Sequence, residues 1–282
     1  PQQNEVNQQV LVRGTYTLKN LFVRVVTNGT TADSTARSRK NSANGAMSVT
    51  IGSGATGAFE DTTNTDSLVD GDLTCGQIVT GAGGTVLSSV FGFGLQADTD
   101  IPILIIGRPE SPAASATTYL PIVGAMESGS TEAPVEYTFR VAATLSNLRV
   151  RVSEFGTDNV TLRFRKNLAN GNQTVTITGT GSFEDTVNTD IMAAGDEGAY
   201  QCVTGVGAPQ FRIIQMKSAS VGYQVGCSDL ANSGIGSDRY YTAQGRAVGT
   251  TTEANAQRTA RISFTAKNLF SYTSVNGATA GA

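Results

Sequence analysis

Apolar and polar side chains alternate along most of the chain with a period of two. Residues 148–153 read LRVRVS, residues 160–165 read VTLRFR and residues 174–178 read TVTIT, so each segment has one apolar face. This pattern predicts half-buried antiparallel strands. No segment shows a convincing 3.6-residue apolar period over three turns, so we expect little helix.

Pairs of residues that favour turns separate the predicted strands. These pairs are Asn28-Gly29, Asn44-Gly45, Asp70-Gly71, Gly83-Gly84 and Asn170-Gly171. Over residues 39–51 the order strand, Asn44-Gly45, strand predicts a β-hairpin. Short strands at a spacing of roughly 8–12 residues with Gly-rich turns predict a sandwich or a barrel.

An internal repeat is the strongest signal in the sequence. Residues 39–66 read RKNSANGAMSVTIGSGATGAFEDTTNTD, and residues 165–190 read RKNLANGNQTVTITGTGSFEDTVNTD. The match extends backwards, where residues 18–25 read LKNLFVRV and residues 145–152 read LSNLRVRV. A period of about 125 residues is far longer than a solenoid repeat and has the size of a domain.

The repeat predicts two homologous domains in tandem. About eight strands fit into each copy, which favours jelly-roll-like antiparallel β-sandwiches over a seven-stranded immunoglobulin domain. We place the first domain at residues 1–125 and the second at residues 126–250. Residues 251–282 are interpreted as a partial repeat start followed by a mobile tail, because residues 266–270 (AKNLF) repeat the start motif once more.

A glutamate precedes each of the three start motifs by the same distance, at Glu5, Glu132 and Glu253. We expect each start segment to close the open edge of the domain before it, with residues 132–145 on the first domain and an orphan strand at residues 253–265 on the second. The N-terminal segment then has no domain to close and is expected to reach a neighbouring subunit. The interface candidates in these terminal segments are Val10, Val12, Phe264 and Phe270.

Composition and charge exclude several functions. The net charge is −3, with 20 basic and 23 acidic residues, which is not the basic footprint of a nucleic-acid-binding protein. No apolar run approaches about 18 residues, so we expect no membrane span. The chain has no histidine, which removes the Ser–His and Cys–His dyads and the common zinc sites. We therefore expect no enzymatic activity and no cofactor.

The chain has three cysteines, Cys75, Cys202 and Cys227, too few for a disulfide framework. We interpret them as small buried hydrophobic residues. A bridge between Cys202 and Cys227 stays open, because the sequence alone does not decide it.

An acidic cluster recurs in both copies and is the best chemical candidate. Its members are Glu60, Asp61 and Asp66 in the first copy and Glu184, Asp185 and Asp190 in the second. Carboxylates with neighbouring Asn and Thr are hard ligands of the kind that Ca²⁺ uses, but the spacing fits no calcium loop. Asp and Asn also stabilise turns through their own backbone. We favour turn stabilisation, with a calcium site and a glycosidase-type carboxylate pair as alternatives.

A basic stripe lies on the polar face of two predicted strands, at Arg149, Arg151, Arg163 and Arg165. We interpret it as a solvated face that pairs with nearby carboxylates, with an interface between subunits or a phosphate site as alternatives. The run IPILII at residues 101–106 is the most hydrophobic segment and is predicted to be a buried strand. A contact between domains or subunits is the alternative for that run.

The order of four motifs resembles a domain of structural proteins of tailed bacteriophages. The motifs are TLSNLRVRV at 144–152, LRFRKN at 162–167, FEDT at 183–186 and AAGD at 193–196. The first copy departs from the pattern at residues 69–72, which read VDGD. The motifs are structural, so the resemblance implies a virion location and a non-catalytic role.

These observations predict a virion structural protein without catalytic turnover. The role we favour is a cement-like capsid decoration protein that binds the assembled shell and forms a homo-oligomer. A tail-fibre or baseplate protein that contacts a host glycan is one alternative. An extracellular filament or adhesin subunit is another.

Overall fold

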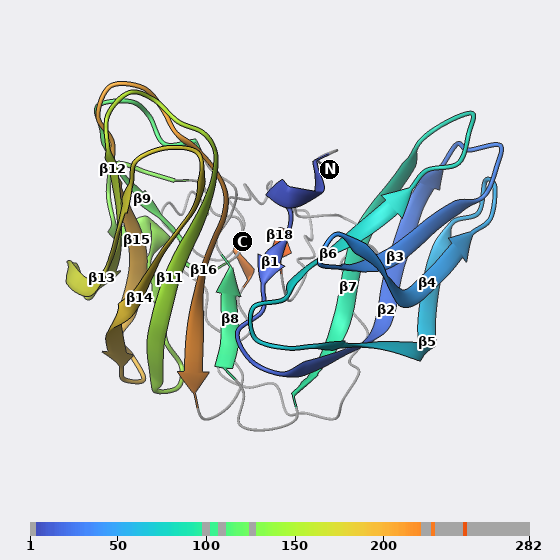
Figure 1. The fold of residues 1–282 in the computed structure, drawn as a ribbon, viewed down its shortest axis with the longest axis horizontal. Helices are drawn as coiled ribbons and strands as arrows, with labels where there is room; N and C mark the ends of the chain where they lie inside the picture. The colour runs from blue at the N-terminus through green and yellow to red at the C-terminus, as the bar shows by residue number, and fades with distance from the viewer. Residues whose placement is uncertain are drawn as a thin grey trace, which may run out of the picture. The chain divides into compact units, whose positions relative to one another are not determined.

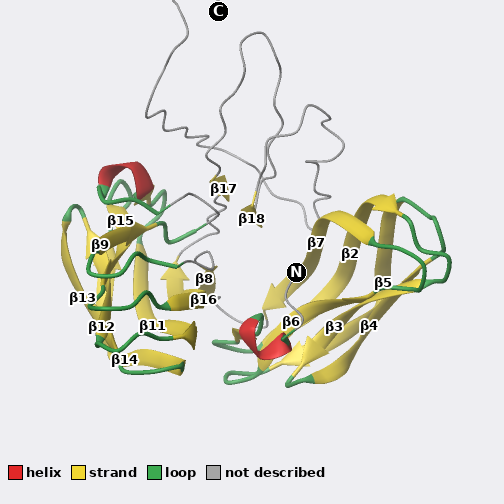
Figure 2. Cartoon of the chain, turned by 90° about the horizontal axis from the view of Figure 1, so that it is seen from above, coloured by secondary structure: helices red, strands yellow, loops and turns green. Residues whose placement is uncertain are grey.

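The computed structural model describes residues 4–97, 102–106, 111–123, 128–220, 227–228 and 245–246. Within these residues, the regular structure is strand apart from two helical turns, η1 (Glu5–Asn7) and η2 (Ala133–Val135) (Figure 2). The strand pairs of the two sandwiches whose register is described run antiparallel, which confirms the predicted all-β class, and the two-residue pair of β17 with β18 is parallel. The chain divides into two compact units near residue 104.

The first unit is a sandwich of two sheets, coloured blue to cyan in Figure 1. Its strands are β1 (Val10–Leu11), β2 (Tyr16–Asn28), β3 (Ser34–Lys40), β4 (Ala43–Ile51), β5 (Gly57–Leu68), β6 (Leu73–Val79) and β7 (Val86–Ala97). One sheet has the order β1-β6-β3-β4, and the other has the order β5-β2-β7. Buried side chains from both sheets, such as Val23 of β2 and Ile51 of β4, form one core.

The second unit repeats this arrangement. Its strands are β8 (Pro102–Ile106), β9 (Thr117–Leu120), β10 (Tyr137–Thr138), β11 (Ala143–Glu154), β12 (Val160–Lys166), β13 (Ala169–Ile177), β14 (Gly181–Met192), β15 (Glu197–Val203) and β16 (Gln210–Ser220). One sheet has the order β10-β15-β12-β13 with β9 also paired to β15, and the other has the order β14-β11-β16-β8. Two further strands, β17 (Cys227–Ser228) and β18 (Gly245–Arg246), pair with each other.

The described part of the first unit has one strand fewer than the eight that we expected. The described residues of the first unit form seven strands divided four and three, as in a seven-stranded sandwich, whereas a jelly roll has eight. The difference arises from the FEDTTNTD segment, which we expected to be a turn between two strands. It lies inside the single long strand β5, and its counterpart lies inside β14.

The predicted hairpin at residues 39–51 exists, but its turn lies elsewhere. Asn41 and Ser42 connect β3 to β4, and their φ angles of 49° and 64° are those of a tight hairpin turn. Gly45 lies within β4, where an added Cβ would lie 2.2 Å from the Ser38 hydroxyl oxygen. The Asn-Gly pair therefore marks a close approach of side chains and not a turn.

The start motif encodes a β-bulge. The pairing of β2 with β5 shifts between Lys19 and Leu21, and Asn20 between them has a φ of 56°. Asn147 has a φ of 57° at the matching shift in β11. Asn tolerates this left-handed conformation better than most residues, which explains why it recurs at both bulges.

The start segments belong to the domains that follow them, contrary to our expectation. Tyr137 and Thr138 pair with β15 of the second unit, and β9 also joins that sheet. The segment placed at the end of the first domain therefore contributes a strand to the second. The N-terminal segment is likewise part of its own unit, because Val10 pairs with Thr74 and Val12 is buried in the first core. Residues 253–265, Phe264, Phe270 and the tail lie outside the described residues.

Candidate binding site: the arginine clamps and the adjoining sheet edge

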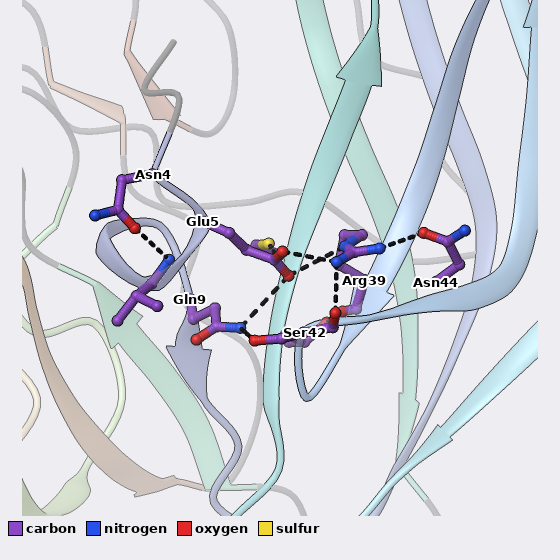
Figure 3. Close-up of polar contacts among 9 residues, drawn as sticks. Asn4, Glu5, Gln9, Arg39, Ser42 and Asn44 are labelled. Carbon is purple, nitrogen blue, oxygen red and sulfur yellow. Dashed lines mark hydrogen bonds and ion pairs between the residues drawn. The ribbon is translucent and has the colours of Figure 1, made fainter.

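The Glu5 carboxylate and the Arg39 guanidinium form a bidentate ion pair that ties the N-terminal turn to β3 (Figure 3). Arg39 Nε donates to Glu5 Oε1 at 3.1 Å, and Arg39 Nη2 donates to Glu5 Oε2 at 2.7 Å. The same guanidinium donates to the Ser42 carbonyl at 2.6 Å and to the Asn44 side chain. Gln9 donates to the Ser42 hydroxyl at 2.9 Å. We call this cluster the first clamp.

The ion pair shifts the titration of both partners. Hydrogen bonding to Arg39 lowers the pKa of Glu5, and the same bond raises the pKa of Arg39. The clamp therefore stays ionised across the physiological range. Asn4 supports it locally, because its side chain accepts a hydrogen bond of 3.2 Å from the Val6 amide and caps the turn that carries Glu5.

The second unit has the same clamp, built from Glu132 and Arg165. Arg165 donates to Glu132 at 2.7 to 3.1 Å and also to the Leu168 carbonyl and the Asn170 side chain. Glu132 is more enclosed than its counterpart, with a side-chain exposure of 7% against 25% for Glu5. The equal spacing of the glutamates was the signal for these clamps, although we assigned it to the closure of the preceding domain.

Strand β9 adds an aromatic side chain to the second clamp. The Arg165 guanidinium lies 5.9 Å from the centre of the Tyr119 ring, a distance at which a cation–π interaction is favourable. The Gln201 side chain donates to the Tyr119 hydroxyl at 3.0 Å. On the opposite face of β9, Thr118 and Leu120 are buried, and Leu120 belongs to the core. Sequence reasoning missed this strand because it has only four residues.

Backbone and hydroxyl contacts extend the attachment of β9. The Thr204 amide donates to the Ala116 carbonyl at 2.9 Å, and the Ala116 amide donates to the Thr204 hydroxyl at 3.0 Å. The Thr204 hydroxyl donates to the Ala113 carbonyl at 2.6 Å. The edge of β15 therefore binds an extended segment through a strand ladder and specific side chains.

The acidic candidates hold the fold together and are engaged by hydrogen-bond donors. Asp61 Oδ1 accepts from the amides of Thr63 and Asn64 at 3.0 Å, and Asp61 Oδ2 accepts from the Ser48 amide and the Asn64 side chain at 2.9 Å. Burial would raise the pKa of Asp61, but these donors outweigh it and lower the pKa to about 2. The structure thus favours the stabilising role over calcium binding for this carboxylate.

The remaining acidic candidates are engaged in similar ways. Asp185 repeats the contacts of Asp61 with the amides of Thr174, Val187 and Asn188. Asp66 accepts from the Ala46 amide, Asp190 accepts from the amides of Asn172 and Gln173, and Glu184 accepts from the Asn147 side chain. Glu60 lies in β5 opposite Phe22. Within the described residues, no group of three or more Cys, Asp or Glu side chains is arranged to hold a metal ion.

In each unit one further carboxylate, in the turn before β6 or β15, binds the hairpin turn that follows β3 or β12. Asp72 binds Lys40 at 2.9 Å and accepts from the Asn41 side chain at 2.7 Å. Asp196 makes the same contacts with Lys166 and Asn167. Hydrogen bonds from Lys166 and Asn167 lower the pKa of Asp196 to about 2.

The structure separates the members of the basic stripe. Arg165 forms the second clamp, and Arg149 is buried, with its guanidinium donating to Ser182 at 2.9 Å. Arg149 and Val12 therefore have little exposed surface, whereas Arg165 is half-buried, and the assignment of all three to an interface stays a prediction. Arg151 and Arg163 are half-buried on the outer faces of their sheets and remain interface predictions.

The two cysteines with described side chains are free thiols. Burial raises the pKa of Cys202 to about 12, and burial together with the nearby Glu5 raises that of Cys75 to about 11. Both are therefore protonated and poorly nucleophilic. Cys202 is fully buried in the second core and forms no bridge.

Beside the second clamp, one carboxyl group has a pKa close to neutral pH. Burial, followed by repulsion from Glu197 and Glu132, raises the pKa of Glu136 to about 7. The first clamp has Gln9 at this position, which has no charge to titrate.

Comparison of the chain with family models, with curated proteins and with solved structures found no match. In the part of the chain that the structure describes, no helix combines the length and the apolar character needed to span a bilayer.

Proposed function

We propose that the protein is a structural component of a tailed-bacteriophage virion that decorates the capsid surface. In this role it binds the assembled shell, forms a homo-oligomer and carries out no reaction. The observation that carries the proposal is the use of the repeated charged side chains. In both units the clamp arginines, together with Asp61 in the first unit and Asp185 in the second, bind neighbouring groups of the fold.

The second unit supplies a physical mode of binding. The edge of β15 holds an extended segment by backbone pairing, with Tyr119 fixed over Arg165 on one face and Leu120 in the core on the other. Backbone pairing provides affinity, and pockets for alternate side chains provide specificity. A rigid sandwich with such an edge suits stable attachment to a repeating surface.

Immunogold electron microscopy of phage particles with antibodies against the purified chain tests the location. We expect label over the head at regular spacing. Label confined to tails or baseplates would support the receptor-binding alternative, and label on free fibres would support the filament alternative. Incubation of the chain with polysaccharides, followed by product analysis, tests the non-enzymatic part, which any specific hydrolysis would overturn.

A further inference from the structure

Within the described residues, the first unit leaves open the sheet edge that the second unit fills. The pairing of β6 with β1 involves only Leu73 and Thr74. Residues 76–79 of β6 pair with β3 on one side and have no described strand on the other. The equivalent residues 200–203 of β15 pair with β12 on one side and with β9 on the other.

The first unit retains the side chains that hold β9 in the second. By strand register, Arg39 corresponds to Arg165, and Gln77 corresponds to Gln201. Thr80 follows β6 as Thr204 follows β15. The residues that bind the Tyr119 ring, the Tyr119 hydroxyl and the backbone before β9 therefore all have counterparts beside the open edge.

Two residues at this edge of the first unit are more exposed than their counterparts in the second, as expected where no strand covers them. Thr80 is exposed, whereas Thr204 is buried beneath the segment that leads into β9. Ile78 is half-buried, whereas Cys202 at the same position has no exposed surface. Counting only described strands, the backbone of residues 76–79 has no partner on this side and Ile78 is incompletely buried, which makes the edge a template for the addition of another strand.

The sequence of the chain contains a second segment that aligns with β9. Thr117 lies 15 residues before Glu132, and Asp238 lies the same distance before Glu253. In this alignment Tyr240 corresponds to Tyr119. Identical residues continue along the alignment at Gly124 and Gly245, Thr131 and Thr252, and Thr138 and Thr259.

We propose that residues 76–79 of one copy bind residues 238–241 of a second copy as an added antiparallel strand. In the register of β9, Tyr240 lies over Arg39 with its hydroxyl at Gln77. Tyr241 takes the inward position of Leu120, opposite Gly76 and beside the Phe91 ring that lies over this glycine. The partner is a second copy because this chain itself carries the matching strand pattern.

The inward position of Arg239 fits the composition of the first core. Arg239 takes the place of Thr118, which pairs with Cys202, and the β12 partner of Cys202 is Leu162, between the buried residues Val160 and Phe164. At the matching positions of β3 the first unit has Ser34 and Ser38. Ser38 donates to the Asp66 carboxylate and Ser34 accepts from the Gly81 amide, so this part of the first core is more polar than its counterpart.

The proposed contact is head to tail. The acceptor edge belongs to the first unit, and the donor strand follows the second unit in sequence. A heterologous contact of this kind forms a ring if its rotation closes and a filament if it does not. The inference rests on the proposed function only in requiring self-association, and it does not depend on the location in the virion.

The test is disulfide trapping between two single-cysteine variants. The background carries Cys75→Ala, as in the second unit, and Cys227→Ser, while Cys202 stays because it is buried. Val79→Cys and Asp238→Cys are placed in separate chains and mixed under mild oxidation, since Val203 and Thr117 are direct partners in the second unit. We expect a covalent dimer whose linked peptides contain residues 79 and 238, at least tenfold more abundant than with Arg239→Cys, which faces the other side.

The matched positive control is a single chain with Thr117→Cys and Val203→Cys, which should close its disulfide. If this control closes and the mixed variants do not cross-link, the proposal is overturned. A chain carrying both Val79→Cys and Asp238→Cys that forms only an intrachain bridge would overturn the second copy as the partner. Head labelling in the absence of any cross-link would refute this inference and leave the proposed function standing.

Discussion

The two units fill the same part of the core with different side chains, next to the edge strand β6 in the first unit and next to β15 in the second. In the second unit Tyr200 of β15 fills the core, and Ile214 lies on the facing sheet. In the first unit Gly76 takes the place of Tyr200, and Phe91 takes the place of Ile214 opposite Val23. A Cβ added to Gly76 would lie 2.1 Å from the Phe91 ring, so the ring occupies the space that Tyr200 fills in the other unit. The aromatic ring therefore lies on β15 in the second unit and on β7 in the first, whereas the strand register around it is the same in both units.

The comparison predicts the largest effect at the clamps. Arg165→Met leaves Glu132 buried without its partner, which should cost the second unit about 3–5 kcal/mol of unfolding free energy. Arg39→Met should cost the first unit about 1 kcal/mol, because Glu5 is more exposed and water can solvate it. Urea unfolding followed by hydrogen exchange in each unit measures the two effects separately. Equal losses would contradict the difference in burial, and Glu132→Gln added to Arg165→Met should recover part of the loss.

The next prediction concerns the aromatic ring, which Phe91 supplies in the first unit and Tyr200 supplies in the second. Gly76→Ala should destabilise the first unit by about 1–3 kcal/mol, because the new methyl group overlaps Phe91. Phe91→Ile should make Gly76→Ala tolerable, and the pair Gly76→Tyr with Phe91→Ile should reproduce the packing of the second unit. Thermal unfolding of the single and double variants checks this coupling. Additive losses in the double variants would show that the two positions do not share one space.

A buried amide distinguishes the units at another pair of positions. Gln173 accepts a hydrogen bond of 2.9 Å from the Leu148 amide and has no exposed surface, whereas the first unit has Met47 there. Gln173→Met should cost about 1–3 kcal/mol, because it leaves the Leu148 amide buried without its acceptor. Chemical denaturation measures the loss. Met47→Leu is the matched control, and it should change stability by less than about 1.5 kcal/mol, as volume-conserving core substitutions do.

The smallest expected effect is a pH dependence confined to the second unit. The pKa of Glu136 is raised to about 7 in the fold, so the folded state holds a proton that the unfolded chain releases near pH 4.5. The stability from this proton is complete below pH 4.5 and is lost as the pH rises through 7. Glu136→Gln should abolish this decline in melting temperature between pH 5 and 8, and Gln9→Glu tests whether it can be transferred to the first unit. An unchanged pH profile in Glu136→Gln would show that another group titrates there.

The sequence predicted strands well because their period is a property of neighbouring residues. It misplaced the hairpin turn because Asn-Gly is a turn signal only when nothing else requires the glycine, and Gly45 is required by Ser38 from another strand. It read the FEDT motif as a turn because Asp61 bonds to its own backbone, as turn aspartates do. The additional bond to Ser48 in the other sheet depends on tertiary structure that a linear pattern does not contain. The clamp glutamates were visible as a spacing, but only the fold identifies their partners.

The bonds from β5 to β4 also have a mechanical consequence. Tension applied to the ends of the first unit enters at β1 and leaves at β7, which lie in different sheets, so the load tends to slide one sheet past the other. Asp61 on Ser48 and Asp66 on Ala46 cross between the sheets and oppose this shear. Because the pKa of Asp61 is about 2, its bond stays intact down to strongly acidic pH. These two bonds therefore stabilise the first sandwich against force applied along the chain.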